Sequence, residues 1–155
     1  MSVEKVEKIL ESKGFKNRIF VFEEGTETSQ KAAEQIGCQV ENIAKSMAFD
    51  LGDRAILVVS SGRSRIDNRK FKDKFGKKAK MVSKDDLVEK IGYPMGGVCP
   101  FGVKDGVEVY FDQSLKKLDA VYPAAGDEAS IVKLKLEEFE DLAQPVEWVD
   151  VTKEG

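Results

Sequence analysis

Hydrophobic residues recur along this chain with two different spacings, and the two spacings alternate from one end to the other. Apolar positions three and four residues apart predict helices at residues 3–10, 28–36, 67–75, 83–91 and 136–143. Short apolar or alternating runs predict strands at residues 18–22, 43–50, 55–60, 79–82, 107–111, 120–122, 132–136 and 146–151.

The run at residues 55–60 is the most apolar of these segments, which favours a central strand. The turn at residues 51–54 joins it to the preceding run, so we expect these two strands to form a hairpin. Several other strand connections are too short for parallel crossovers. We therefore expect an α+β (mixed α/β) fold. A single domain over residues 1–155 would hold a curved mixed β-sheet or partial barrel with helices packed outside.

Composition narrows the possible chemistry. Hydrophobic residues make up 41% of the chain and charged residues 34%, which is typical of a globular protein. No apolar run has transmembrane length and no signal peptide is visible, so we expect a cytoplasmic protein with reduced cysteines. Because the chain has no histidine, catalysis by serine–histidine or cysteine–histidine pairs is excluded, as are most zinc sites. We expect neither a metal nor another cofactor.

Charge is unevenly distributed over the sequence. The formal net charge is −3, yet residues 61–80 contain nine basic and two acidic residues. A basic patch on an acidic protein indicates a polyanionic partner. The alternative is a solvated helix face without a partner.

A glycine-rich segment occupies residues 96–102, with the sequence Gly-Gly-Val-Cys-Pro-Phe-Gly. Three glycines and a proline cannot lie inside a helix or a central strand. The apolar residues between them argue against a mobile linker. The segment is interpreted either as the rigid wall of a small-molecule pocket with exposed amides, or as a tight turn between two elements.

Lys45 is the most conspicuous candidate for chemistry, because it alternates with apolar neighbours in the predicted strand at residues 43–50. It is either an edge residue that reaches solvent or an ammonium group fixed in a pocket. In a pocket it would bind a phosphate or stabilise an oxyanion.

An ordered set of short motifs runs through nearly the whole chain. These motifs are Thr28-Ser29-x-x-Ala32-Ala33-x-x-Ile36-Gly37, Ile43-x-Lys45-Ser46-Met47-x-Phe49, Leu57-Val58-Val59 with Gly62, Asp67 with Lys70, Gly76, Gly92-Tyr93-x-x-Gly96-Gly97-Val98-x-Pro100-Phe101-Gly102, Asp112-x-Ser114-Leu115 and Ala124-Ala125-Gly126. Together they resemble the YbaK/ProX family, which includes free-standing aminoacyl-tRNA deacylases and the editing domain of bacterial prolyl-tRNA synthetases.

The resemblance implies a trans-editing hydrolase that cleaves the ester of a mischarged aminoacyl-tRNA without a metal or a covalent nucleophile. An activated ester needs only a positioned water and oxyanion stabilisation. The family's functional lysine matches Lys45, which either takes part in the chemistry or holds the terminal nucleotide. Its pocket loop matches Gly96 to Pro100, where the amides of Gly96 and Gly97 are candidate oxyanion donors.

Other residues are assigned to substrate and tRNA contacts under the same resemblance. Candidate substrate-binding residues are Thr28, Phe49, Ser60, Val98, Cys99, Pro100, Phe101, Asp112 and Gly126. Candidate tRNA-binding residues are Arg63, Arg65, Lys70, Lys72, Lys74, Lys77 and Lys78. Expected partners are the acceptor end of aminoacyl-tRNA and, as a second candidate, an aminoacyl-tRNA synthetase.

Three of these positions carry alternatives. Thr28 is equally suited to a helix N-cap and Ser60 to a strand end, and Asp112 is either an orienting group for water or Lys45, or a helix cap. Cys99 is expected to be a pocket-wall thiol rather than a nucleophile. The segment Ala124-Ala125-Gly126 lacks the histidine of alanine-editing members, so the amino acid preference stays open.

Two other functions compete with hydrolysis. One is a non-catalytic module that binds tRNA or a synthetase, and the other is a binder of small phosphorylated ligands that uses Lys45 and the loop amides. The presence of both Lys45 and the glycine–proline frame favours the enzyme.

Overall fold

The computed structural model describes residues 2–22, 29–127 and 129–154. Its α-helices are α1 (Ser2–Ser12), α2 (Ser29–Ile36), α3 (Asn68–Phe75), α4 (Leu87–Lys90) and α5 (Leu136–Ala143). Short 3₁₀ helices are η1 (Lys16–Arg18), η2 (Val40–Asn42), η3 (Lys84–Asp86) and η4 (Gln113–Leu115). The strands are β1 (Ile19–Val21), β2 (Ile43–Asp50), β3 (Ala55–Ser61), β4 (Ser64–Ile66), β5 (Glu108–Asp112), β6 (Ala120–Pro123), β7 (Ser130–Val132), β8 (Leu134–Lys135), β9 (Glu147–Val149) and β10 (Thr152–Glu154).

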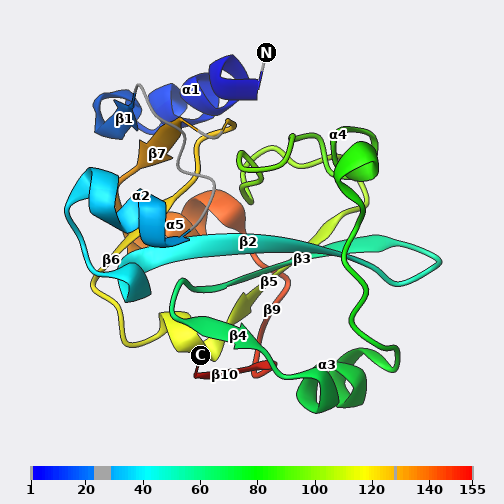
Figure 1. Ribbon diagram of the computed structural model, residues 1–155. Helices are drawn as coiled ribbons and strands as arrows, with labels where there is room; N and C mark the ends of the chain where they lie inside the picture. The colour runs from blue at the N-terminus through cyan, green and yellow to red at the C-terminus, as the bar shows by residue number, and fades with distance from the viewer. Residues whose placement is uncertain (1, 23–28, 128, 155) are drawn as a thin grey trace.

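A curved six-stranded sheet forms the centre, in the order β8-β6-β2-β3-β5-β9, and Figure 1 shows the helices around it. The predicted hairpin is confirmed, because β2 and β3 pair antiparallel from Ala44 opposite Ser61 to Asp50 opposite Ala55. The β3–β5 and β5–β9 pairs are parallel, so the sheet is mixed, as expected. Two small ribbons, β1–β7 and β4–β10, complete the fold.

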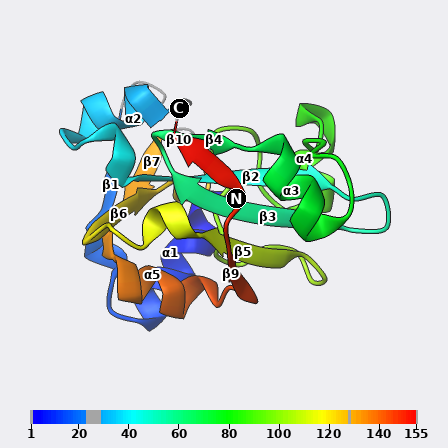
Figure 2. The same ribbon diagram turned by 90° about the horizontal axis from the view of Figure 1, so that it is seen from below.

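The two faces of the sheet are covered by different elements, as the view from below in Figure 2 also shows. One face carries the larger core, to which α1 contributes Val6 and Leu10 and α5 contributes Phe139. The opposite face packs against α3 through Phe71 and against the C-terminal segment through Val151. The alternation of side chains along β2 and β3 supplies apolar residues to both faces, as expected for central strands.

Two predicted strands and one predicted helix differ from the structure, and one ribbon is not predicted. The helix expected at residues 83–91 is a 3₁₀ turn, η3, followed by the four-residue α4. Residues 79–82 form only an isolated bridge, between Met81 and Phe49. The continuous strand expected at residues 132–136 is interrupted at Lys133, where β7 leaves to pair with β1 and β8 begins to pair with β6. The sequence does not predict the β4–β10 ribbon, because strands of three residues are too short to show a periodic pattern.

Within the described ranges, no helix combines the length and the apolar composition that crossing a membrane requires.

Phe71 is the main contact of α3 with the sheet. Its side chain is fully buried, and its ring centroid lies 4.7 Å from those of both Phe49 and Phe75. We expect Phe71→Ala to lower the free energy of unfolding by about 3–5 kcal/mol, since the substitution leaves a cavity. The measurement is a urea titration. The control is Phe20→Ala in β1, where the side chain is 41% exposed and the expected loss is about 1 kcal/mol or less. Equal losses in the two variants would contradict this account of the α3 contact.

Candidate functional site

One edge of β2 is only partly paired, and this gap creates the site. On that edge β2 pairs with β6 at Ile43 and Ala44. Farther along, Val82 donates its N–H to the Ala48 carbonyl, and Asp50 donates its N–H to the Lys80 carbonyl. Among the described strands, none pairs with this edge at residues 45–47. A ligand can therefore approach the backbone of β2 there.

A cavity of about 350 Å³ opens beside this gap. Its walls come from α2, β2, the segment before α4, the glycine-rich loop and the β6–β7 region, and most of them are apolar. The lining residues are Ser29, Ala32, Ile43, Ala44, Lys45, Ser46, Ala48, Met81, Val82, Leu87, Met95, Gly96, Val98, Tyr122, Ala124 and Ile131. Among the described residues, no three cysteine, aspartate or glutamate side chains come together as candidate metal ligands.

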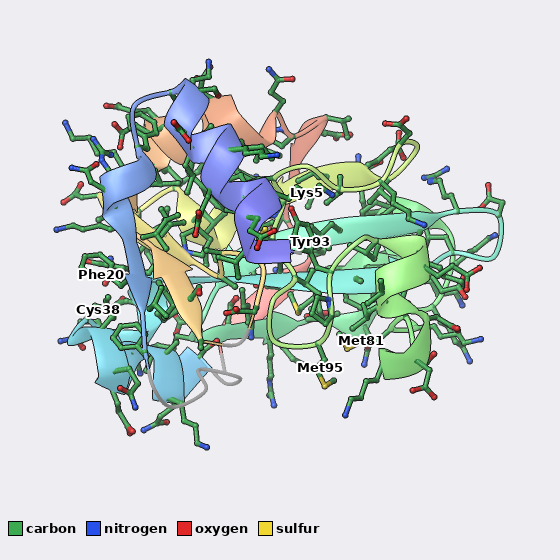
Figure 3. All side chains as sticks on the ribbon, turned by 90° about the horizontal axis from the view of Figure 1, so that it is seen from above. Lys5, Phe20, Cys38, Met81, Tyr93 and Met95 are labelled. Carbon is green, nitrogen blue, oxygen red and sulfur yellow. The ribbon has the colours of Figure 1, made fainter. Side chains whose placement is uncertain are left out.

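Two methionines form an exposed apolar rim at the cavity. Met81 is 58% exposed and Met95 is 56% exposed, and both line the cavity. Figure 3 shows them on the same side of the molecule, Met81 in the segment before α4 and Met95 directly before the glycine-rich loop. Unbranched thioether side chains adapt to the shape of a bound group, which suits a ligand that enters between them.

Ser46 also lines the cavity, although it is not among the residues predicted for the site. Its Oγ atom is buried and has no hydrogen-bond partner among the described residues. Strand alternation places it on the same face of β2 as Ala44 and Ala48, which are core residues. The signal in the sequence was the small-residue alternation Ala44-x-Ser46-x-Ala48. An unpaired buried hydroxyl beside an apolar cavity is a candidate hydrogen-bonding group for a ligand.

Lys45 lines the cavity at the open edge of β2, and alternation along the strand places its side chain on the face of Phe49, where its ammonium group lies beside the β3–β4 turn. The Nζ atom donates a hydrogen bond to the carbonyl oxygen of Ser64. Burial lowers the pKa of the Lys45 ammonium, because desolvation disfavours the charged form. No carboxylate forms an ion pair with Lys45 in the described part of the chain. Its only recorded partner is a neutral carbonyl, so the ammonium charge can attract an anion.

The glycine-rich loop meets the cavity at Gly96 and Val98. Gly96 has a φ of +85°, a conformation that favours glycine. Gly97 packs backbone to backbone, because an added Cβ would lie 2.5 Å from the carbonyl carbon and oxygen of Gly126. The N–H of Gly97 donates to the carbonyl of Pro94 at 3.0 Å. Of the two candidate oxyanion donors, the N–H of Gly97 therefore closes a turn. Gly126 does not line the cavity, but its backbone packs against the loop at Gly97.

The remaining loop candidates lie behind the cavity wall. Cys99, Pro100 and Phe101 are buried and do not line the cavity. The Tyr93 hydroxyl donates to the Phe101 carbonyl, which fixes the loop from the core side. Burial raises the pKa of the Cys99 thiol to about 11, so the thiol is protonated at neutral pH. The expected pocket-wall role of Cys99 is replaced by a core position.

Three other candidate substrate-binding residues, Phe49, Ser60 and Asp112, are buried and do not line the cavity. Phe49 packs on Phe71. The Ser60 hydroxyl is buried and without a partner among the described residues. Asp112 accepts hydrogen bonds from the N–H groups of Ser114 and Val151, both at 2.9 Å. The predicted cap at Asp112 is thus confirmed. Thr28 lies outside the described residues.

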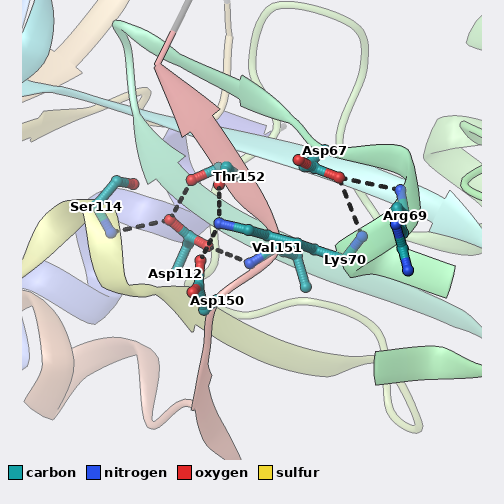
Figure 4. Close-up of polar contacts among 8 residues, drawn as sticks. All are labelled: Asp67, Arg69, Lys70, Asp112, Ser114, Asp150, Val151 and Thr152. Carbon is teal, nitrogen blue, oxygen red and sulfur yellow. Dashed lines mark hydrogen bonds and ion pairs between the residues drawn. The ribbon is translucent and has the colours of Figure 1, made fainter. Parts of the chain in front are cut away.

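Asp112 also anchors the C-terminal segment, as Figure 4 shows. The Thr152 hydroxyl donates to its carboxylate at 2.7 Å, and Asp112 is 1% exposed. The carboxylate therefore has three donors and holds β10 against the end of β5.

The seven basic candidates divide into two groups. Three lysines are ion-paired: Lys70 with Asp150 at 3.1 Å, Lys74 with Glu147 at 2.5 Å and Lys77 with Asp53 at 3.6 Å. The other four are exposed and have no ion pair recorded among the described residues; they are Arg63, Arg65, Lys72 and Lys78.

The tight contact of Gly97 leads to a test of the loop. We expect Gly97→Ala to lower the free energy of unfolding by about 1–3 kcal/mol, because the new methyl group meets the Gly126 backbone. Chemical denaturation measures the loss. Met95→Ala serves as the control, since this exposed side chain directly before the loop should change stability by about 0.5 kcal/mol or less. A fully stable Gly97→Ala protein would contradict the packing described.

The raised pKa of Cys99 also has a measurable consequence. In a Cys38→Ser variant, a thiol reagent at pH 8 should leave the native protein unlabelled, because the Cys99 thiol is buried and protonated below a pKa of about 11. Reactivity should appear as the protein unfolds in denaturant. Rapid labelling of the native protein, followed by mass spectrometry, would restore Cys99 as a candidate nucleophile.

Comparisons with known proteins place this site in context. YwhH of Bacillus subtilis (strain 168), an uncharacterized protein, is 41% identical over 139 residues, which cover 89% of this chain and 88% of YwhH. The proline–tRNA ligase of Thermosipho melanesiensis is 27% identical over 102 residues, which cover 65% of this chain and 18% of the ligase.

Solved structures share the fold. A protein proposed to be a trans-editing enzyme for prolyl-tRNA synthetase superposes with a TM-score of 0.86 at 26% identity, over 98% of this chain and 97% of that one. The hypothetical protein APE2540 gives a TM-score of 0.82, also at 26% identity, over 96% and 99% of the two chains. The model of the aminoacyl-tRNA editing domain matches residues 23–142. This range includes Lys45, the glycine-rich loop and all the residues that line the cavity. The chain belongs to the aminoacyl-tRNA editing domain family.

Proposed function

We propose that this protein hydrolyses the ester bond of mischarged aminoacyl-tRNA as a free-standing editing enzyme. The observation that carries the proposal is the cavity beside the unpaired edge of β2, which both Lys45 and Gly96 line. The family match and the trans-editing structural neighbour support a role in tRNA editing. The proline–tRNA ligase relatives make a synthetase a reasonable partner.

In the proposed complex, the aminoacyl group enters the cavity between Met81 and Met95. Its side chain contacts the apolar wall, to which Ser46 contributes an unpaired hydroxyl. The ammonium group of Lys45 attracts the negatively charged end of the tRNA and thereby sets the position of the ester. The N–H of Gly96 is the loop amide that we assign to the developing oxyanion.

The reaction proceeds by direct attack of water. The oxygen of a bound water bonds to the ester carbonyl carbon, which gives a tetrahedral oxyanion. The bond from this carbon to the ribose oxygen then breaks, and the proton lost by the water ends on the ribose oxygen. Cys99 takes no part, because its thiol is buried and protonated. Positioning and electrostatic stabilisation suffice, since an aminoacyl ester is already activated.

Lys45 is the test of this assignment. We expect both Lys45→Ala and Lys45→Met to lower the deacylation rate at least about a hundredfold, in an assay with a panel of mischarged tRNAs. Lys45→Met keeps the aliphatic stem that packs at the strand, so its stability should stay within about 1 kcal/mol of the parent. Lys117→Ala removes an exposed lysine elsewhere and should keep the parental rate.

Two results would count against the proposal. A parental rate in Lys45→Met would remove Lys45 from the mechanism. Tight binding of aminoacyl-tRNA by the parent, without hydrolysis of any member of the panel, would instead favour the non-catalytic binding module.

A further inference from the structure

The β4–β10 ribbon carries two like charges directly opposite each other. The register pairs Thr152 with Ile66, Lys153 with Arg65 and Glu154 with Ser64. Lys153 and Arg65 are both exposed, and neither forms an ion pair recorded among the described residues. Directly opposed side chains of an antiparallel pair lie on the same face, and like charges there destabilise the pairing. A bound anion would turn this repulsion into a favourable contact.

The ribbon begins at one end of the cavity. At the β3–β4 turn, an added Cβ on Gly62 would lie 3.1 Å from the Cβ of Ser29 and 3.1 Å from that of Ile43, two cavity residues. The N–H of Gly62 donates to the Ile43 carbonyl at 2.7 Å. The next ribbon carbonyl, that of Ser64, accepts the hydrogen bond of Lys45. Basic residues therefore follow one another from Lys45 at the cavity, through Arg63 in the β3–β4 turn, to Arg65 and Lys153 in the ribbon.

The exposed side of α3 differs from the ribbon in its relation to the cavity and in its charge balance. Figure 1 shows α3 and the ribbon on the same side of the sheet, but no residue of α3 lines the cavity, whereas the turn at Gly62 that leads into the ribbon packs on cavity residues. Of the four basic residues of α3, Lys70 and Lys74 are paired with Asp150 and Glu147.

Two acidic residues lie near the ribbon, and among the described residues neither forms an ion pair with Arg65 or Lys153. Asp67 caps α3 by accepting the N–H groups of Arg69 and Lys70 (Figure 4). The hydrogen bond from the Lys70 N–H and, to a smaller extent, the charge of Lys153 lower the pKa of the Asp67 carboxyl, but the side chains of Asp67 and Lys153 form no ion pair among the described residues. Glu154 lies opposite Ser64.

From this arrangement we infer that the β4–β10 ribbon, through Arg63, Arg65 and Lys153, binds the phosphate groups of the tRNA strand that leads out of the cavity, and that the exposed side of α3 does not. The inference rests on the proposed function for the identity of the nucleic acid. Guanidinium groups match phosphate with two parallel N–H donors, which favours arginine at such positions. Each phosphate contact releases a counterion, so the affinity falls with salt.

The decisive variant is Arg65→Glu, because its effects on affinity and on stability have opposite signs. The new carboxylate would repel phosphate, yet it would lie opposite Lys153 and form a favourable cross-strand pair. We expect the affinity for uncharged tRNA at low salt to fall about five- to tenfold, and the slope of log affinity against log salt to become shallower by about one. The melting temperature should be equal or higher.

The matched control is Lys72→Glu on α3, which makes the same change in charge at an exposed residue with no recorded ion pair among the described residues. It should leave both affinity and salt slope nearly unchanged. Lys153→Glu tests the other member of the pair and should reproduce the loss of affinity and the shallower salt slope of Arg65→Glu. Fluorescence anisotropy with labelled, uncharged tRNA measures all four proteins.

The outcomes separate this inference from the proposed function, because uncharged tRNA has no ester to hydrolyse. Selective loss in Arg65→Glu and Lys153→Glu supports the ribbon as the binding surface, even if the parent deacylates nothing. Equal losses in Lys72→Glu would overturn it in favour of unspecific charge attraction. An unchanged affinity in Arg65→Glu, or no tRNA binding by the parent at low salt, would also overturn it.

Discussion

The incomplete pairing of β2 is the constraint on which the site depends. This strand is hydrogen-bonded to β3 along one edge, but on the other edge β6 stops at Ala44 and the segment before α4 begins only at Ala48. Buried backbone groups normally find partners, so a gap in a central strand needs a reason. Here the gap faces the cavity. The same interruption that weakens the sheet gives a ligand access to its backbone.

The elements around this gap are held from behind by close contacts. Gly97 fits against Gly126 without space for a side chain, and Tyr93 bonds the Phe101 carbonyl within the core. These contacts keep the glycine-rich loop at a fixed distance from β2, so the cavity exists before any ligand arrives. A preformed site of this kind suits a reaction that needs positioning more than reactive side chains.

On the opposite face, Asp112 ties the C-terminal segment to the sheet. Its carboxylate accepts from Val151 and Thr152, and β10 then pairs with β4. The Ser64 carbonyl of β4 accepts a hydrogen bond from the ammonium group of Lys45. Asp112 is therefore linked to a residue of the cavity wall through β10 and β4. A residue far from the cavity in the sequence thus supports the position of the candidate lysine.

Local patterns in the sequence determined α1, α2, α3 and α5, the β2–β3 hairpin and the loop with Gly96 and Gly97, since turn chemistry and periodicity act over a few residues. They also indicated Lys45 and the cap at Asp112. Only the tertiary structure decided that Phe49 and Cys99 leave the cavity while Ser46, Met81 and Met95 enter it. It likewise created the β4–β10 ribbon from segments some ninety residues apart. The physical reason is that strand pairing across such distances depends on how the whole sheet twists and packs, which no local pattern encodes.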